Sequence, residues 1–206
     1  VRARKPDGEM EVRTGLVVGA DGRHSVVRAE AGLRVEDFGA PMDVLWFRLS
    51  RGAEDPNTPV GRFESGRIFI MLNRGDYWQC GFVIPKGSLE RLRAEGLPAF
   101  RASVAQLAPF AADRVMELTE WDGIKLLTVK VDRLREWSRP GLLCIGDAAH
   151  AMSPVGGVGI NLATQDAVAA PNRLAPPLRE NRTTEADLEA VQRRRMFPTR
   201  VTQRLQ

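Results

Sequence analysis

The chain has 206 residues, of which 43% are hydrophobic, so it can bury the core of one large domain or two small ones. Its net charge of +4 is spread along the sequence, which argues against a nucleic-acid-binding surface. No apolar run reaches the ~18 residues of a transmembrane helix, and no signal peptide is expected.

The first forty residues are expected to hold a hairpin, a short buried strand and the start of a helix. The hairpin turns at 6–8, and the strand spans 16–20. Ser25 is an N-cap candidate for a helix over 25–31. Between strand and helix stands Gly19-Ala20-Asp21-Gly22, whose glycines permit a tight turn and a close approach of the backbone to a ligand. Taken alone, these four residues fit an ordinary turn better than a ligand site.

Residues 41–131 are of a different kind, because strands and turns are grouped together there. The predicted elements are strands at 44–49, 67–72, 78–84 and 124–131, a hairpin turn at 73–76, and helices at 89–95 and 99–107. This grouping indicates a mostly antiparallel sheet with helices on one face. Its larger apolar residues either form the core or line an apolar pocket: Trp46, Phe63, Phe69, Met71, Trp78, Phe82 and Trp121.

A second buried strand, 142–145, is followed by a glycine-rich loop and then by apolar residues at helical spacing from Ile160 to Leu174. This arrangement is typical of a parallel strand. It brings free backbone N–H groups and the positive end of a helix dipole to the strand's C-terminal edge, where anionic or polyhydroxylated ligands bind well. Asp147 follows the strand directly. Its carboxylate is therefore expected to accept hydrogen bonds from ligand hydroxyls rather than to contact phosphate.

The last part of the chain is expected to be helical with two interruptions. Pro176-Pro177 is predicted to end the helix that starts near Ile160, and Pro198 to break a second helix that begins at the cap Thr184. Arg193-Arg194-Arg195, within that second helix, is interpreted as a solvated face.

The two cysteines, Cys80 and Cys144, both stand in apolar strands. They are expected to be buried free thiols of a cytoplasmic protein rather than a disulfide or metal ligands.

The residues after strand 142–145 form a specific motif through their order and spacing. Gly146-Asp147-Ala148-Ala149-His150, followed by Pro154, Gly157, Gly159, Asn161 and Asp166, resembles the second flavin-binding motif of FAD-dependent monooxygenases of the para-hydroxybenzoate hydroxylase type. The resemblance implies that Asp147 holds the FAD ribityl chain and that the following turn and helix start lie near the isoalloxazine ring. Val158 stands where the family commonly has Gln, a departure that backbone contacts tolerate. The implied cofactor contacts are Gly146, Asp147, Pro154, Gly157, Val158, Gly159, Ile160 and Asn161.

Residues 19–28 match a second signature of the same family, the Asp-Gly motif. The resemblance implies that Asp21, Gly22 and Arg28 shape the region near the FAD pyrophosphate and, in the family, also serve the pyridine nucleotide. This motif stands upstream of the Gly146 motif, in the family's order. That order favours a ligand site over an ordinary turn.

The resemblance implies a mixed α/β (α+β) fold. An incomplete FAD-binding Rossmann-like domain is formed by residues 1–40 and 132–206, with an inserted antiparallel-sheet substrate domain at 41–131. The implied reaction is reduction of FAD by NADH or NADPH, then reaction with O2 to a flavin C4a-hydroperoxide that hydroxylates an aromatic or other apolar small molecule. The protein's part is positioning, electrostatics and exclusion of water. No residue is identified as catalytic, and no oligomeric state is indicated.

Such a cofactor site also needs a βαβ unit with the pattern G-x-G-x-x-G, and the sequence contains none. The resemblance therefore extends only to the later portion of the family. The chain is expected to be a truncated flavoprotein, and its 206 residues alone are predicted to bind FAD weakly or not at all.

Other functions of the same fold stay open. Ile84-Pro85 also ends a motif of flavin-dependent halogenases, but the second Trp of that motif is absent beside Trp78. A reductase of isoprenoid chains shares both motifs, and an inactive fragment is the non-enzymatic alternative. His150 is either a catalytic base or, as we prefer, a residue packed in the loop with hydrogen bonds to the backbone. His24 is expected to face solvent, and no Cys/His cluster indicates a metal site.

Overall fold

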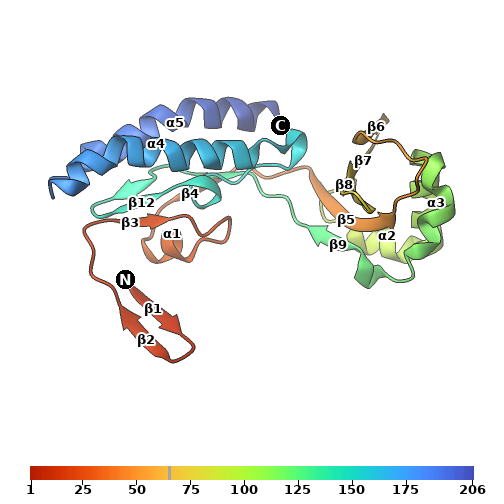
Figure 1. Ribbon diagram of the computed structural model, residues 1–206, viewed down its shortest axis with the longest axis horizontal. Helices are drawn as coiled ribbons and strands as arrows, with labels where there is room; N and C mark the ends of the chain where they lie inside the picture. The colour runs from red at the N-terminus through yellow and green to blue at the C-terminus, as the bar shows by residue number, and fades with distance from the viewer. Residues whose placement is uncertain (65) are drawn as a thin grey trace. The chain divides into compact units, whose positions relative to one another are not determined.

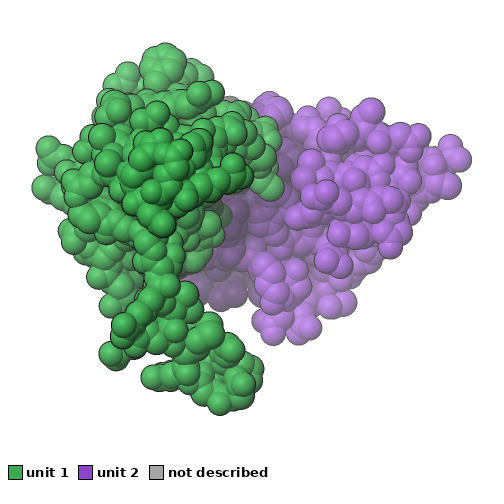
Figure 2. All heavy atoms as spheres, turned by 60° about the vertical axis from the view of Figure 1, so that its left-hand side comes forward, with its two compact units in different colours: residues 1–39, 130–206 green, residues 40–129 purple. Residues whose placement is uncertain are grey.

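The computed structural model describes residues 1–64 and 66–206 (Figure 1). The chain folds into two compact units, which Figure 2 draws in different colours. Unit 1 comprises residues 1–39 and 130–206, and unit 2 comprises residues 40–129. Helices and sheets occur in both, and antiparallel pairing predominates, which confirms the predicted mixed class.

Unit 1 is built on a three-stranded sheet of order β11-β12-β3. Strands β3 (Val17–Gly19) and β12 (Leu142–Cys144) are parallel, as predicted, and their C-terminal residues Gly19 and Cys144 pair with each other. Strand β11 (Ser138–Arg139) is antiparallel to β12. Because parallel strands end at the same edge of a sheet, the segments that follow β3 and β12 leave it side by side.

Two smaller antiparallel pairs complete the strands of unit 1. Strands β1 (Arg2–Lys5) and β2 (Gly8–Glu11) form the predicted N-terminal hairpin. Strands β4 (Val35–Asp37) and β10 (Asp132–Leu134) pair although neither was predicted, since each is only three residues long and carries charged side chains.

The two long helices of unit 1 are α4 (Gly159–Arg179) and α5 (Glu185–Leu205), which lie side by side in Figure 1. The predictions that Pro176-Pro177 ends the first helix and that Pro198 breaks the second were wrong, because both helices continue through their prolines. The physical reason is tertiary packing: Leu174 and Pro177 are buried, and burial of a helix face outweighs a few lost backbone hydrogen bonds.

Other helical features of unit 1 agree with the sequence. Thr184 forms the predicted cap, a reciprocal capping box with Asp187. The short helix α1 (Val26–Glu30) begins after Ser25, whose hydroxyl accepts from Arg28 N at 3.0 Å. Across the described part of the chain, no helix combines the length and the apolar composition that crossing a membrane requires.

Unit 2 contains a five-stranded antiparallel sheet of order β6-β7-β8-β5-β9. Its strands are β5 (Met42–Ser50), β6 (Val60–Glu64), β7 (Arg67–Asn73), β8 (Tyr77–Pro85) and β9 (Lys125–Leu127). Strand β9 is shorter than the predicted 124–131, and β6 was not predicted because its middle residues, Gly61 and Arg62, are not strand formers. The predicted turn between β7 and β8 is confirmed, with Gly75 at φ +94°.

One face of this sheet is covered by helices. These are α2 (Leu89–Glu95), α3 (Leu97–Leu107) and the 3-10 segments η1 (Pro109–Glu117) and η2 (Trp121–Gly123). Alternate strand residues pack with Phe100 and Val104 of α3, so four residues considered for a pocket belong to the core: Phe69, Met71, Trp78 and Phe82. The strand residues between them, among them Trp46 and Ile70, point to the opposite face.

Candidate functional site

The structure brings the two motif loops of unit 1 together at one edge of the β11-β12-β3 sheet. The Asp21-Gly22 loop leaves β3, and Gly146-Asp147 leaves β12. An Arg23 Nη2 atom of the first loop lies 3.8 Å from Asp147 Oδ2 of the second. The two predicted motifs therefore share one region, although more than a hundred residues separate them in the sequence.

The turn after β12 requires a glycine at position 146. Gly146 has φ +59°, and a Cβ there would lie 3.1 Å from Ala163 Cβ of α4. Its N–H donates to Asp166 Oδ2 at 3.0 Å. The turn is thus packed directly against the first part of α4, and Asp147 is carried on a fixed backbone.

Asp147 offers an available carboxylate. Its side chain is 36% exposed, and apart from the distant Arg23 it has no hydrogen-bond or ion-pair partner among the described residues. A carboxylate in this state can accept hydrogen bonds from two or more hydroxyl groups of a ligand.

Asp21 has a different environment, because its carboxylate is already engaged. It accepts from Ser25 Oγ at 2.5 Å and from Val27 N at 3.1 Å. Burial by itself raises the pKa of Asp21, but these hydrogen bonds outweigh burial and hold the pKa below its ordinary value. Asp21 therefore orders the start of α1, with the adjoining Gly22 at φ +83°.

Arg28 links the two loops from inside the protein. Its guanidinium donates to both carboxylate oxygens of Asp132, at 3.2 and 3.3 Å, and to the carbonyls of Arg23 and Ala148, at 2.7 and 3.3 Å. Its side chain is buried. These contacts use the planar fork of Arg for positioning one loop against the other.

The segment from Pro154 to Asn161 is an exposed glycine-rich turn that leads into α4. Gly157 has φ +64° and no atom near the position of a Cβ, so its backbone is open to a ligand. Val158 is the N-cap residue of α4, and no described side chain caps this first turn. Ile160 is 74% exposed. Free N–H groups and the positive end of a 21-residue helix thus face outward here.

A buried polar network beneath the turn was not predicted. Asp166 is fully buried and accepts from Gly146 N, from His150 Nε2 at 2.6 Å and from Arg195 Nε at 2.7 Å. The prediction that the His150 side chain bonds to the backbone was therefore wrong, because its Nε2 atom bonds to Asp166. The prediction that Arg195 belongs to a solvated face was also wrong, because Arg195 is buried. His24 is exposed, as expected.

This network could not be predicted from the sequence, because Arg195 is 29 residues from Asp166. Which face of α5 is buried also depends on how the helix packs. The one signal available in the sequence was Asp166 at a buried position of α4, where a carboxylate needs a partner.

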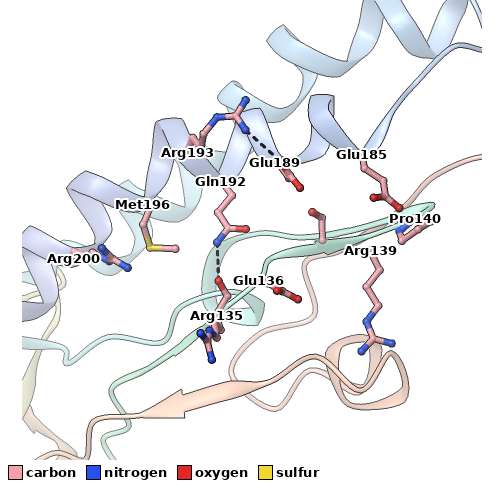
Figure 3. Close-up of a pocket in the computed structure, with 11 residues that line it drawn as sticks. Arg135, Glu136, Arg139, Pro140, Glu185, Glu189, Gln192, Arg193, Met196 and Arg200 are labelled. Atoms are coloured by element: carbon pink, nitrogen blue, oxygen red, sulfur yellow. Dashed lines mark hydrogen bonds and ion pairs between the residues drawn. The ribbon is translucent and has the colours of Figure 1, made fainter.

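Other concave or polar regions of unit 1 do not coincide with these loops. A cavity of ≈ 600 Å³ lies between α5 and the segment 135–140, where Glu189 and Gln192 line it together with Arg139 (Figure 3). It contains none of the predicted site residues. The described residues include no group of three or more His, Cys, Asp or Glu side chains placed to hold a metal ion.

The available Asp147, the open backbone at Gly157 and the uncapped start of α4 together fit a ligand that carries both hydroxyl groups and negative charge. FAD is such a ligand, with a ribityl chain and a pyrophosphate. The residues present therefore fit this cofactor.

Comparisons with known proteins agree with this fit. A family model described as FAD binding domain matches residues 1–205. The 6-methylpretetramide 4-monooxygenase of Streptomyces rimosus is 38% identical over 95% of this chain and 47% of its own length. Digeranylgeranylglycerophospholipid reductase 2 of Methanothermobacter thermautotrophicus is 32% identical over 79% of this chain and 41% of its own length.

Among solved structures, that of pqsL, a probable FAD-dependent monooxygenase from Pseudomonas aeruginosa, has the same fold. Its TM-score is 0.78 at 23% identity, over 98% of this chain and 56% of that one. The chain spans about half the length of the curated relatives it matches. Because the family model extends over nearly all of its residues, the chain belongs to the FAD binding domain family.

Proposed function

We propose that unit 1 supplies flavin-binding residues of an FAD-dependent monooxygenase that hydroxylates an aromatic or other apolar small molecule. The observation that carries this proposal is the position of Asp147, an available carboxylate beside the Asp-Gly loop and close to the start of α4. The name of the 38%-identical relative, a 4-monooxygenase of 6-methylpretetramide, supports hydroxylation as the reaction class.

In this proposal each motif has a separate part. Asp147 accepts hydrogen bonds from the ribityl hydroxyls, and the backbone from Pro154 through Val158 to Asn161 faces the ring system. Gly22 lets the first loop approach the pyrophosphate, while Asp21 and Arg28 hold that loop in place. When bound, FAD supplies the redox and oxygen chemistry, with NADH or NADPH as the proposed reductant and O2 as the oxidant.

We propose the face of the unit 2 sheet that lies opposite to the helix-covered one as the surface that contacts the substrate. Gly81 is essential to its shape, because a Cβ there would lie 2.9 Å from Ile70 Cγ1 and 3.2 Å from Trp46 Cη2. The two apolar side chains therefore occupy the space over the glycine, where a substrate ring could contact them. A cavity of ≈ 580 Å³, lined in part by Trp46 and Tyr77, adjoins it and has the size of small-molecule sites, roughly 300–1,000 Å³.

If this face of the sheet contacts the substrate, Trp46→Ala is expected to lower the catalytic efficiency. Loss of the indole ring removes the contact with an aromatic substrate, so kcat/KM is expected to fall about tenfold or more, since burial of such a side chain contributes about 1.5–3 kcal/mol. FAD content is expected to stay unchanged. Leu126→Ala, on the opposite side of the sheet and 41% exposed, serves as the control. Equal losses in the two variants contradict the assignment of this face.

A complete cofactor site needs a nucleotide-binding βαβ unit besides these residues, because no G-x-G-x-x-G occurs in the sequence. We therefore propose to test the function in a chimera that joins this chain behind the unmatched part of the Streptomyces rimosus relative. The chimera is expected to purify with FAD and to consume NADH or NADPH and O2, with one oxygen atom of 18O2 found in a hydroxylated aromatic product. The 206 residues alone are expected to retain little or no flavin.

A second candidate function is reduction of isoprenoid chains, which the 32%-identical digeranylgeranylglycerophospholipid reductase favours. A reductase saturates carbon–carbon double bonds and leaves no 18O in its product. A hydroxylase places one 18O atom in its product and leaves the double bonds unsaturated. The same chimera therefore separates the two candidates. A chimera that binds no FAD contradicts both and favours an inactive fragment.

We also propose a cytoplasmic location. Cys80 and Cys144 are both free and buried, and burial raises their pKa values to about 12 and about 11. Inert thiols of this kind agree with a reducing compartment.

A further inference from the structure

Helix α5 contacts the segment 146–157 at several points, although no residue of α5 belongs to the predicted cofactor contacts. Near its middle, Arg195 Nε donates to Asp166 Oδ1 at 2.7 Å, and Asp166 Oδ2 accepts from Gly146 N at 3.0 Å. The carboxylate of Asp166 therefore connects the helix to the turn that carries Asp147.

Gln203 in the last turn of α5 and Gln206, the residue that follows the helix, hold the next part of the same segment. Gln203 Nε2 donates to the carbonyl of Ala151 at 3.0 Å and to that of Asp132 at 2.8 Å. Gln206 Nε2 donates to the carbonyls of Ser153 and Val155, at 3.1 and 2.8 Å. Two amide groups thus donate to four backbone carbonyls, of which that of Ala151 also accepts from Asp132 N at 3.2 Å.

The surroundings of Asp166 make this connection rigid. Burial alone raises the pKa of Asp166, but the hydrogen bonds from His150, Arg195 and Gly146 outweigh it and hold the pKa below its ordinary value. An ionised carboxylate only accepts hydrogen bonds, so His150 Nε2 carries its hydrogen toward Asp166. Three donors from the turn, the loop and α5 therefore converge on one buried anion. Moving this carboxylate lowers the stability of the fold, because the three donors are then buried without an acceptor.

We propose that Asp166, Arg195, Gln203 and Gln206 are positioning residues for the flavin site, and that α5 fixes the segment 146–157 in its binding-competent shape. This inference rests on the function proposed above, since the segment's ligand is FAD. None of the four residues touches the cofactor in this account. Their effect passes through Gly146 and through the carbonyls of Ala151, Ser153 and Val155.

Two sets of substitutions separate positioning from general stability. Asp166→Leu with Arg195→Met removes both charges of the buried ion pair, but it leaves Gly146 N and His150 Nε2 without their acceptor, so this variant is also expected to lose stability. Gln203→Met with Gln206→Met keeps the side-chain length and removes the amide donors. Arg204→Met with Leu205→Ala changes two exposed neighbours on the same turn and is the matched control.

The first measurement is hydrogen–deuterium exchange in the 206-residue chain, followed by mass spectrometry. Both positioning variants are expected to raise exchange about tenfold or more in 146–157, with no matching rise in the core of α4 near Leu174. The control is expected to leave both regions unchanged. Equal exchange in 146–157 between the Gln variant and the unsubstituted chain overturns the inference.

The second measurement is the FAD dissociation constant of the chimera. Both positioning variants are expected to bind FAD about tenfold more weakly, and the Gln203→Met, Gln206→Met variant is expected to keep a melting temperature close to that of the parent. Unchanged affinity in the Gln203→Met, Gln206→Met variant overturns the inference even if the Asp166→Leu, Arg195→Met variant fails to fold. Failure of the unsubstituted chimera to bind FAD instead contradicts the proposed function, and the exchange experiment then still decides whether α5 positions the segment.

Discussion

Asp147 and Asp166 stand in the same motif and have opposite surroundings. Asp166 is fully buried with three donors, whereas Asp147 is 36% exposed and has only the distant Arg23 as a partner. Motif spacing predicts that Asp147 follows a strand end, and the strand is there. The partners of Asp166 could not be predicted, because Arg195 comes from another helix and its burial depends on how that helix packs.

A residue-scale prediction concerns Asp55 in unit 2. Its buried carboxylate accepts from Arg114 Nη2 at 2.9 Å, from Trp78 Nε1 at 2.7 Å and from Gly52 N at 3.0 Å. Hydrogen bonds from Arg114, above all, hold the pKa of Asp55 well below its ordinary value, against the opposite effect of burial. Asp55→Ala removes the buried partner of Arg114 and leaves only the exposed Asp113 as its ion-pair partner, so the free energy of unfolding is expected to fall by about 3 kcal/mol in urea denaturation at pH 7.

The same pair predicts a pH dependence. Because the folded-state pKa of Asp55 lies below its unfolded value, near 3.8, its contribution to stability is complete above that value and is lost as pH falls toward the folded pKa. The difference in unfolding free energy between the parent and Asp55→Ala is therefore expected to shrink between about pH 4 and pH 2. A difference that stays constant over this interval rules out the ionised pair as its source.

At the scale of elements, helix α4 departs most from its sequence prediction. Pro171, Pro176 and Pro177 all lie inside it, and a local rule ends the helix at such residues. Helix α4 packs against α5, and this packing stabilises α4 in spite of its prolines. The packing cannot be seen in the sequence of α4 alone. Strands β3 and β12 were predicted because two short apolar runs stand before the two motifs, whereas their parallel pairing with each other is a finding of the structure. Strand β6 was missed because Gly61 and Arg62, in its middle, are not strand formers.

Helix α4 leads to a prediction about Pro171, which is exposed. In Pro171→Ala, a restored backbone N–H can donate to the carbonyl of Ala167 and no packing is lost. The free energy of unfolding is expected to rise by about 1 kcal/mol, since helix propensity outweighs the added freedom of the unfolded chain. Pro177→Ala is the comparison, because Pro177 is buried and its ring packs. A lower stability of Pro171→Ala than of the parent contradicts this explanation of α4.

At the scale of the whole molecule, the order of elements explains how the proposed cofactor site and the proposed substrate surface share one chain. Unit 1 is made of two separated stretches, 1–39 and 130–206, and each contributes one motif loop to the same sheet edge. Unit 2 lies between them in sequence and has a sheet with one face covered by helices. The sequence predicts this organisation through the order of its motifs. It does not predict how α5 supports the site, since that depends on side chains far apart in the sequence.

The central claim is that Asp147 binds the flavin, and a titration of the chimera with FAD tests it most directly. In Asp147→Ala the ribityl hydroxyls lose a charged acceptor, a hydrogen bond worth about 1.5–3 kcal/mol, so the dissociation constant is expected to rise about ten- to a hundredfold. Asp113→Ala, an exposed carboxylate of unit 2, is expected to leave it unchanged. Equal FAD affinity in the Asp147→Ala variant and the parent would contradict the account.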